Sequence, residues 1–246
     1  MAIFQLPLLL LNRFTPGRDR RDSISYGDSP LMTYDEFPSK LGTAPLVIFW
    51  HGGSWKNGQK ERNRFVGHTL QKMGVHAFVV DYPKYPQQVF PGFLDDAVLA
   101  IKHIISQYPQ RKVVLMGHSA GGHTALMVAL KDMAQVNAVV AFSAPCTIRE
   151  KYWRPVFGDT IRNGQHDPRN FADSSPTSLS TLLIHGTFDA TVSVNDSVSL
   201  DKKLRASKRD SQLMKLKFVD HLLILPLAML GALPRAHKRL KQFLLV

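Results

Sequence analysis

The stretch Gly117-His118-Ser119-Ala120-Gly121-Gly122 decides the fold of this chain. It follows a short apolar run, 112–116, and precedes a run with helical character, 124–130. A serine between a strand and a helix, with glycines two positions before and after it, is typical of a tight, strained turn. Such a turn lifts the Ser119 hydroxyl above the carboxyl edge of a sheet, where a helix N-terminus stabilises negative charge. We therefore predict that Ser119 is a nucleophile. A glycine-rich structural turn with an idle serine is the alternative.

Strand-like runs recur on both sides of this turn. Two of them flank Gly27-Asp28-Ser29-Pro30 and predict an antiparallel hairpin, and the other six alternate with helical stretches. The eight runs are 23–26, 31–37, 45–50, 76–82, 112–116, 136–143, 180–185 and 212–219. Because the last six lack strict alternation of polar and apolar residues, we expect parallel strands buried on both faces. The clearest helix is predicted to begin after Pro91 and to stop near Tyr108.

This alternation predicts an α/β fold with a mostly parallel central sheet of about eight strands and helices on both faces. No repeat, charge block or Gly/Ser linker divides residues 1–246, so we expect a single domain. The segment 147–177 is the exception to the alternation. It is rich in Pro, Asp, Asn and Arg, and it predicts an excursion or small cap above the site.

A serine hydroxyl needs a base, and that base needs an orienting third group. Asp189 follows the run 180–185, beyond a strand's carboxyl end where ligands gather in open α/β sheets. His221 follows the last run and is predicted to be the general base, whereas His237 is expected on the surface. Asp220 is the rival acid. Because neighbouring side chains on an extended segment point apart, we expect Asp189 and not Asp220 to contact His221.

The stretch His51-Gly52-Gly53-Ser54-Trp55 follows the strand-like run 45–50. Two glycines after a strand allow the backbone to approach a reacting carbonyl closely, and a tetrahedral oxyanion needs such preorganised N–H donors. We expect the donors to be the backbone N–H groups of Gly53, Ser54 and Ala120. His51 is interpreted as a scaffold that hydrogen-bonds the loop rather than as a second base.

Together these features resemble the α/β-hydrolase superfamily, and more closely its small carboxylesterases and lipases of the hormone-sensitive-lipase and kynurenine-formamidase-like type. The matching pieces run from Tyr26 to His221 and are Tyr26-Gly27, His51–Trp55, Asp81-Tyr82, Pro91–Ala97, Gly117–Gly122, His185–Asp189 and His221. The oxyanion loop departs from the three glycines of many lipases, and Pro83-Lys84-Tyr85-Pro86 replaces an Arg-Leu-Ala-Pro run, so the resemblance is specific for fold and much less so for substrate.

The resemblance implies a serine esterase that cleaves carboxylic esters of small molecules through an acyl-enzyme. Two alternatives stay open. The same machinery could cleave an N-formyl group or another amide, or the chain could be a non-catalytic binding protein with a hydrolase fold. No cofactor is expected, because the sequence contains neither a G-x-G-x-x-G fingerprint nor a cluster with zinc-ligand spacing.

Composition limits the partners. The net charge is +12, and residues 201–246 contain eleven Lys and Arg against three Asp. We interpret this basic flank as a solvated helix face, with association with an anionic membrane surface as the alternative; no motif accompanies it that would predict nucleic-acid binding. The single cysteine, Cys146, cannot form an internal disulfide, and the apolar run Ile3–Leu11 lacks the features of a secretory signal, so we expect a cytoplasmic location.

Overall fold

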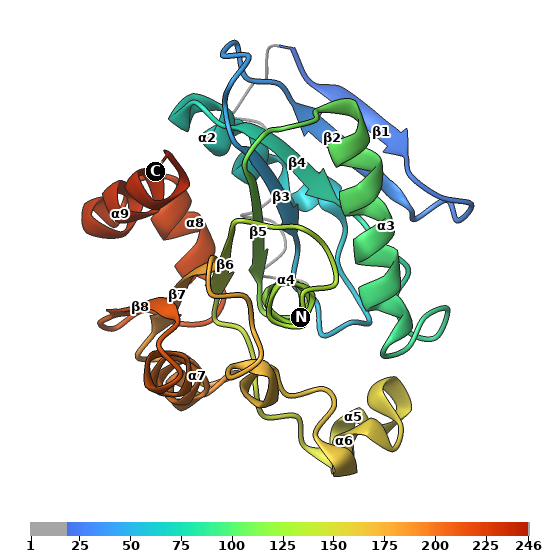
Figure 1. Cartoon of the computed structure of the whole chain (residues 1–246), viewed down its shortest axis with the longest axis vertical. Coiled ribbons are helices and arrows are strands. Elements are labelled where there is room, and N and C mark those ends of the chain that lie inside the picture. Colours follow the sequence, from blue (N-terminus) through green and yellow to red (C-terminus); the bar gives the residue numbers. More distant parts are fainter. Residues whose placement is uncertain (1–18, 246) are drawn as a thin grey trace.

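The computed structural model describes residues 19–245, and an eight-stranded sheet forms its centre (Figure 1). The strands are β1 (Arg21–Ser25), β2 (Thr33–Phe37), β3 (Leu46–Trp50), β4 (His76–Val80), β5 (Val113–His118), β6 (Ala138–Phe142), β7 (Ser180–Gly186) and β8 (Asp210–Leu216). Their order across the sheet is β1-β2-β4-β3-β5-β6-β7-β8. The pairs β1–β2 and β2–β4 are antiparallel and all others are parallel. The predicted hairpin and mostly parallel sheet are confirmed.

Helices cover both faces of the sheet, as predicted. On one face lie α3 (Gly92–Gln107), α4 (Ala120–Leu130) and α7 (Val194–Ala206), which contribute Leu94, Leu126 and Leu200 to one apolar core. On the other face lie α2 (Arg64–Met73), α8 (Ile224–Met229) and α9 (Pro234–Leu245), which belong to a second core. The helix α3 begins after Pro91, as expected, whereas α4 begins directly after Ser119, earlier than the apolar periodicity indicated.

The central strands are buried along their whole length, but β8 is not. Every residue of β3, β4, β5 and β6 is buried, which agrees with the prediction from their continuous apolar runs. In β8 only Ser211 is buried, and Asp210 and Lys215 are exposed. The expectation that this strand is buried on both faces is wrong. Within the described residues it lies at the edge of the sheet and pairs with β7 alone, so it keeps one side open to solvent.

The excursion at 147–177 folds into α5 (Glu150–Phe157), α6 (Thr160–Asn163) and the short helix η2 (Pro168–Phe171). Figure 1 shows α5 and α6 at the lower end of the view, set apart from the helices that cover the sheet. Aromatic contacts attach this excursion to the loop after β3. The ring of Trp55 lies 4.8 Å from that of Phe157 and 5.5 Å from that of Trp153, both edge to face.

The parallel strands all point their carboxyl ends toward one edge of the sheet, and this edge positions the site. The loops after β3, β5, β7 and β8 meet there, although they come from distant parts of the sequence. The helix η1 (Lys60–Asn63) closes the loop after β3.

Two further expectations concern the cysteine and the N-terminal apolar run. Cys146 is buried and unpaired, as expected for a small core residue. The apolar run Ile3–Leu11 lies outside the described residues. Within residues 19–245, no helix is long and apolar enough to cross a lipid bilayer.

Candidate active site

Ser119 lies in the turn between β5 and α4 with φ 53° and ψ −121°, in the left-handed half of backbone space. Nearby glycines are required for this turn. A Cβ on Gly117 would lie 2.3 Å from the carbonyl carbon of Gly121, and a Cβ on Gly121 would lie 2.2 Å from the carbonyl oxygen of Trp50. The Ser119 N–H donates to the carbonyl of Phe142 on β6, at 2.8 Å. The strained turn is therefore held by close backbone packing and fixes the hydroxyl at the carboxyl edge.

His221 joins the hydroxyl to a carboxylate. Its Nε2 lies 2.9 Å from Ser119 Oγ, and its Nδ1 lies 2.7 Å from Asp189 Oδ2. The carboxylate can only accept, so Nδ1 carries a proton and donates it, and Nε2 of the neutral ring is left to accept from the hydroxyl. The structure thus brings together the three residues that the sequence predicts as nucleophile, base and acid.

Several donors besides His221 stabilise the negative charge of Asp189. Its side chain is fully buried, and Oδ1 accepts the backbone N–H groups of Thr191 at 3.0 Å and Val192 at 2.8 Å. The Nε2 of His185 also lies 3.3 Å from Oδ2. Burial alone would raise the pKa of Asp189, but the hydrogen bonds from His185, His221 and Val192 hold it well below its usual range. His185, which comes from β7, was not assigned a role from the sequence.

The rival carboxylate is engaged elsewhere. Asp220 Oδ1 accepts the backbone N–H groups of Leu222 and Leu223, both at 2.8 Å, so it closes the turn that follows His221. The contact between His221 and Asp189 agrees with the prediction that neighbouring side chains on an extended segment diverge.

The glycine loop after β3 lies against the nucleophile. A Cβ on Gly52 would lie 3.0 Å from the Ser119 Cβ, and a Cβ on Gly53, which has φ 135°, would lie 2.0 Å from the carbonyl oxygen of Asn57. Gly53 accepts the N–H groups of Lys56 and Asn57 through its own carbonyl. Within residues 19–245, no hydrogen bond occupies the backbone N–H of Gly53, Ser54 or Ala120. All three predicted donors are therefore free to bind a ligand.

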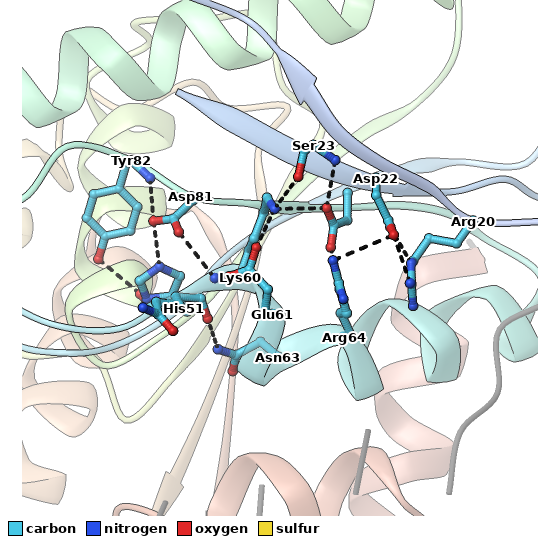
Figure 2. Close-up of polar contacts among 12 residues, drawn as sticks. Arg20, Asp22, Ser23, His51, Lys60, Glu61, Asn63, Arg64, Asp81 and Tyr82 are labelled. Atoms are coloured by element: carbon cyan, nitrogen blue, oxygen red, sulfur yellow. Dashed lines mark hydrogen bonds and ion pairs between the residues drawn. The ribbon is translucent and has the colours of Figure 1, made fainter. Parts of the chain in front are cut away.

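A second polar cluster lies behind this loop, and Figure 2 shows how its side chains meet. His51 Nδ1 lies 2.7 Å from the carbonyl oxygen of Gly52, and its Nε2 lies 3.2 Å from Asp81 Oδ1. Asp81 also accepts the N–H of Tyr82 at 2.8 Å and an ammonium proton of Lys84. These contacts agree with the interpretation of His51 as a scaffold for the loop. They also give Asp81-Tyr82 and Lys84 a structural place that the sequence did not predict.

This buried cluster continues toward the N-terminal hairpin (Figure 2). The Lys60 ammonium lies 3.0 Å from Asp35 Oδ1, and the Arg64 Nε lies 2.6 Å from Asp35 Oδ2. The side chain of Asp35, on β2, is fully buried and that of Lys60 is 3% exposed. The Lys60 N–H reaches Asp81 Oδ2 at 3.4 Å and joins the two groups of charges. Sequence reasoning missed this link because its members are far apart in the chain.

Two further histidines lie on either side of the Ser119 turn in the sequence, and each forms a hydrogen bond with a backbone carbonyl. His118 donates through Nε2 to the carbonyl of His221 at 2.9 Å, and burial lowers its pKa to about 3. His123 donates to the carbonyl of His166 at 2.8 Å, and burial lowers its pKa to about 4. Both are neutral near pH 7. No group of three or more His, Cys, Asp or Glu side chains in the described part of the chain could hold a metal ion.

Ser119 and Asp189 line an open pocket of about 760 Å³. One wall comes from Ser54 and Trp55 of the glycine loop and another from residues 187 and 189–194. The start of the excursion forms a third wall through Ile148, Tyr152 and Trp153. The pocket therefore places the Ser119 hydroxyl among aromatic, aliphatic and polar side chains, which suits a small organic substrate.

Comparison with solved structures agrees with this architecture. A truncated carbohydrate esterase from gut microbiota superposes with a TM-score of 0.79 at 16% identity, over 93% of this chain and 95% of that one. A hormone-sensitive lipase from a metagenome library gives a TM-score of 0.69 at 18% identity, over 98% and 89% of the two chains. The chain therefore has the α/β-hydrolase fold, as its motifs predicted.

Sequence comparison finds a family model and curated relatives that match part of this chain. Residues 36–151 match the BD-FAE family, a segment that includes the glycine loop and Ser119 but ends before Asp189 and His221. The versiconal hemiacetal acetate esterase of Aspergillus parasiticus is 38% identical over 113 residues, 44% of this chain and 36% of that protein. The kynurenine formamidase of Meyerozyma guilliermondii is 31% identical over 108 residues, 43% of this chain and 41% of that protein. The match thus spans less than half the length of either relative.

Proposed function

We propose that this α/β-hydrolase cleaves carboxylic esters of small molecules through an acyl-enzyme formed on Ser119. The observation that carries the proposal is the position of His221, with Nε2 2.9 Å from the Ser119 hydroxyl and Nδ1 2.7 Å from Asp189. A hydroxyl, a neutral imidazole and a buried carboxylate in this order make a nucleophile that can be deprotonated as it attacks.

The reaction follows from these contacts. Ser119 Oγ attacks the ester carbonyl while Nε2 of His221 takes the hydroxyl proton, and Asp189 stabilises the imidazolium that forms. The imidazolium then protonates the leaving alcohol, which departs and leaves the acyl group on Ser119. Water repeats the attack with His221 again as base, and the acid and free serine are regenerated.

The negative charge of the tetrahedral intermediate needs donors beside Ser119. We assign this role to the backbone N–H groups of Gly53, Ser54 and Ala120, which are free of other partners within residues 19–245. Ala120 is the first residue of α4, so its N–H also lies at the positive end of a helix dipole. Donors fixed in the backbone need little reorganisation when charge develops.

A second candidate is hydrolysis of an N-formyl or other amide bond by the same residues. The similarity to a kynurenine formamidase favours it, because that relative matches the chain over 108 residues. The two activities differ only in the leaving group, which must be protonated by His221 in both cases. A non-catalytic binding role would leave the contacts among Ser119, His221 and Asp189 without a purpose.

The test is covalent labelling of the full chain with a fluorophosphonate, which reacts with activated serines. We expect the wild type to be labelled and Ser119→Ala to be unlabelled, with turnover lowered by a factor of about 10⁴ or more. A panel of p-nitrophenyl esters of increasing chain length, run beside an N-formyl aromatic amine, separates the two activities. Equal labelling of wild type and variant would refute the assignment of Ser119.

A further inference from the structure

Four large apolar side chains are exposed together beside the candidate active site. Phe188 is 61% exposed and Phe218 is 74% exposed, and the neighbouring Leu222 and Leu223 are 52% and 51% exposed. Isolated apolar side chains on a surface need no explanation, but these four follow the ends of two paired strands, β7 and β8. We call these four residues the apolar tip.

The two phenylalanines of the tip are held in place by an extension of the β7–β8 ladder. The Thr187 N–H donates to Leu216 at 2.9 Å, and the Phe188 N–H donates to Val219 at 3.0 Å. The Phe218 N–H donates to Thr187 Oγ1 at 3.0 Å. The two rings then meet edge to face with centroids 5.1 Å apart. The backbone therefore presents the rings as an ordered pair.

Phe218 is unfavourable for the stability of the fold. Its φ is 61°, in the left-handed region where a bulky side chain is disfavoured and where Asn or Gly fits well. Its ring also leaves apolar surface in water. The combination of a left-handed backbone and an exposed ring favours a role for the ring in contacts outside the chain.

The tip adjoins the candidate active site along the chain. Phe188 directly precedes Asp189, and Leu222 directly follows His221. Thr187, which fixes the Phe218 turn, also lines the pocket that contains Ser119. Whatever covers the apolar tip therefore lies close to the pocket.

The charged residues near the apolar tip indicate what kind of surface it binds. Lys215 and Lys217 are exposed, and neither forms an ion pair with another described residue. Of the two acids next to the tip in sequence, Asp189 is fully buried against His221, and Asp220 uses its carboxylate to accept the Leu222 and Leu223 N–H groups. The whole chain carries a net charge of +12. Apolar side chains flanked by lysines match a surface in which anionic headgroups lie over hydrocarbon, because ammonium groups bind the former while rings enter the latter.

We propose that the apolar tip docks this protein on an anionic lipid bilayer, which brings the pocket close to the membrane surface. Phe188, Phe218, Leu222 and Leu223 enter the boundary between headgroups and acyl chains, and Lys215 and Lys217 contact the headgroups. The proposal goes beyond ester hydrolysis and does not depend on it, since membrane binding is measured without turnover.

Co-sedimentation with vesicles of phosphatidylcholine, with and without phosphatidylglycerol, tests this docking. We expect the wild type to bind the anionic vesicles at low salt and Phe218→Asn to bind about tenfold or more weakly. Asparagine suits the left-handed backbone, so thermal unfolding of the variant should not fall. The matched control is Leu41→Asn, because Leu41 is 61% exposed but precedes β3, at the opposite edge of the sheet. We expect that control to bind like the wild type.

Three further measurements make the outcome decisive. Lys217→Gln should weaken binding most at low salt, and Ser119→Ala should bind vesicles as the wild type does, which separates docking from catalysis. Hydrolysis of a soluble short-chain ester should be unchanged in Phe218→Asn. The proposal is overturned if the wild type does not bind anionic vesicles or if Phe218→Asn and Leu41→Asn bind equally. It is also overturned if light scattering shows a wild-type dimer that Phe218→Asn dissociates, because the tip would then cover a second copy.

Discussion

Among the buried contacts between histidine and aspartate in residues 19–245, two look alike: one lies beside Ser119 and the other behind the glycine loop. In one pair His221 contacts Asp189 at 2.7 Å, and in the other His51 contacts Asp81 at 3.2 Å. Both histidines are largely buried, at 7% and 1% exposure. In both pairs, other groups also donate hydrogen bonds to the carboxylate and hold the pKa of the aspartate well below its usual range, against the effect of burial.

The difference lies at the second ring nitrogen. His221 Nε2 faces a hydroxyl, Ser119 Oγ, which can donate a proton to it. Both nitrogens of His51 face atoms that only accept, the Asp81 carboxylate and the carbonyl of Gly52. A base needs a lone pair directed at an acidic proton, so only His221 can act as one. Residue type and burial alone do not identify a base, and the partner of the second nitrogen does.

Replacing each aspartate by asparagine should break the two pairs in different ways, and this is the largest expected effect. Asp189→Asn favours the wrong tautomer of His221, so kcat should fall by about 10³ to 10⁴, with partial recovery at high pH. Asp81→Asn leaves the buried Lys84 ammonium without its carboxylate partner, so the free energy of unfolding should fall by about 3 kcal/mol or more. Among folded molecules, kcat should fall far less than in Asp189→Asn.

Initial rates across pH and urea unfolding curves for both variants measure these effects. Wild-type protein provides the common reference for rate and for stability. If Asp81→Asn lost turnover as severely as Asp189→Asn while remaining equally stable, the distinction between a catalytic and a scaffolding pair would be wrong.

A substitution in the loop between the two pairs should have the next largest effect. In Gly53→Val the new Cβ would lie 2.0 Å from the Asn57 carbonyl oxygen, so the loop must move. We expect kcat to fall by about 10²-fold or more with a smaller rise in KM, because the N–H donors act on the developing oxyanion. Gly42→Val is the control, since a Cβ on Gly42 meets nothing within 4 Å. A change in KM alone would make this a binding loop.

Stability should depend on pH through a third histidine, His118, which connects the turn at Ser119 to the loop that carries His221. Burial lowers the pKa of His118 to about 3, whereas an unfolded histidine titrates near 6.5. The unfolded chain therefore takes up the proton first. Stability is at its full value above roughly pH 6.5 and falls as the pH drops toward 3. Denaturant midpoints at several pH values should fall less steeply in His118→Gln, which still can donate to the His221 carbonyl. An identical slope in both proteins would exclude His118 as a source of the pH dependence.

The smallest effect is expected at the carboxylate that neighbours the base. Asp220 Oδ1 accepts two backbone N–H groups, and the amide oxygen of Asp220→Asn can do the same. The variant should therefore lose less than about tenfold in kcat. Its rate, measured beside that of Asp189→Asn, sharpens the distinction between a residue that contacts the imidazole and one that closes its turn. A crippled Asp220→Asn with a nearly normal Asp189→Asn would reverse the assignment of the acid.

The candidate residues could be read from the sequence because each follows a strand at its carboxyl end. In parallel strands these ends share one edge, so the sequence positions of Ser119, Asp189 and His221 predict their proximity without knowledge of strand order. The glycines at 52 and 53 were informative for a similar reason, since close backbone approach leaves a local mark in the sequence.

Contacts that depend on strand order could not be predicted in this way. Asp35 meets Lys60 and Arg64 only because β2 lies beside β4, and His185 reaches Asp189 only through the fold of the loop after β7. The exposure of β8 was misjudged because an apolar run does not say whether its strand has one neighbour or two. His237, expected on the surface, is half-buried and lies 3.1 Å from the carbonyl of Ala228.

The separation of 102 residues between Ser119 and His221 has a consequence for how the protein is made. At a synthesis rate of about 5 to 20 residues per second, the ribosome adds the histidine roughly 5 to 20 s after the serine. During that interval β5 and α4 can form the turn that carries Ser119, but β8, the strand that precedes His221, has not yet been synthesised. With Ser119 and His221 in the proposed roles, a nascent chain carries a hydroxyl without its base until β8 and His221 have been added. Translation then sets the time at which the proposed activity appears.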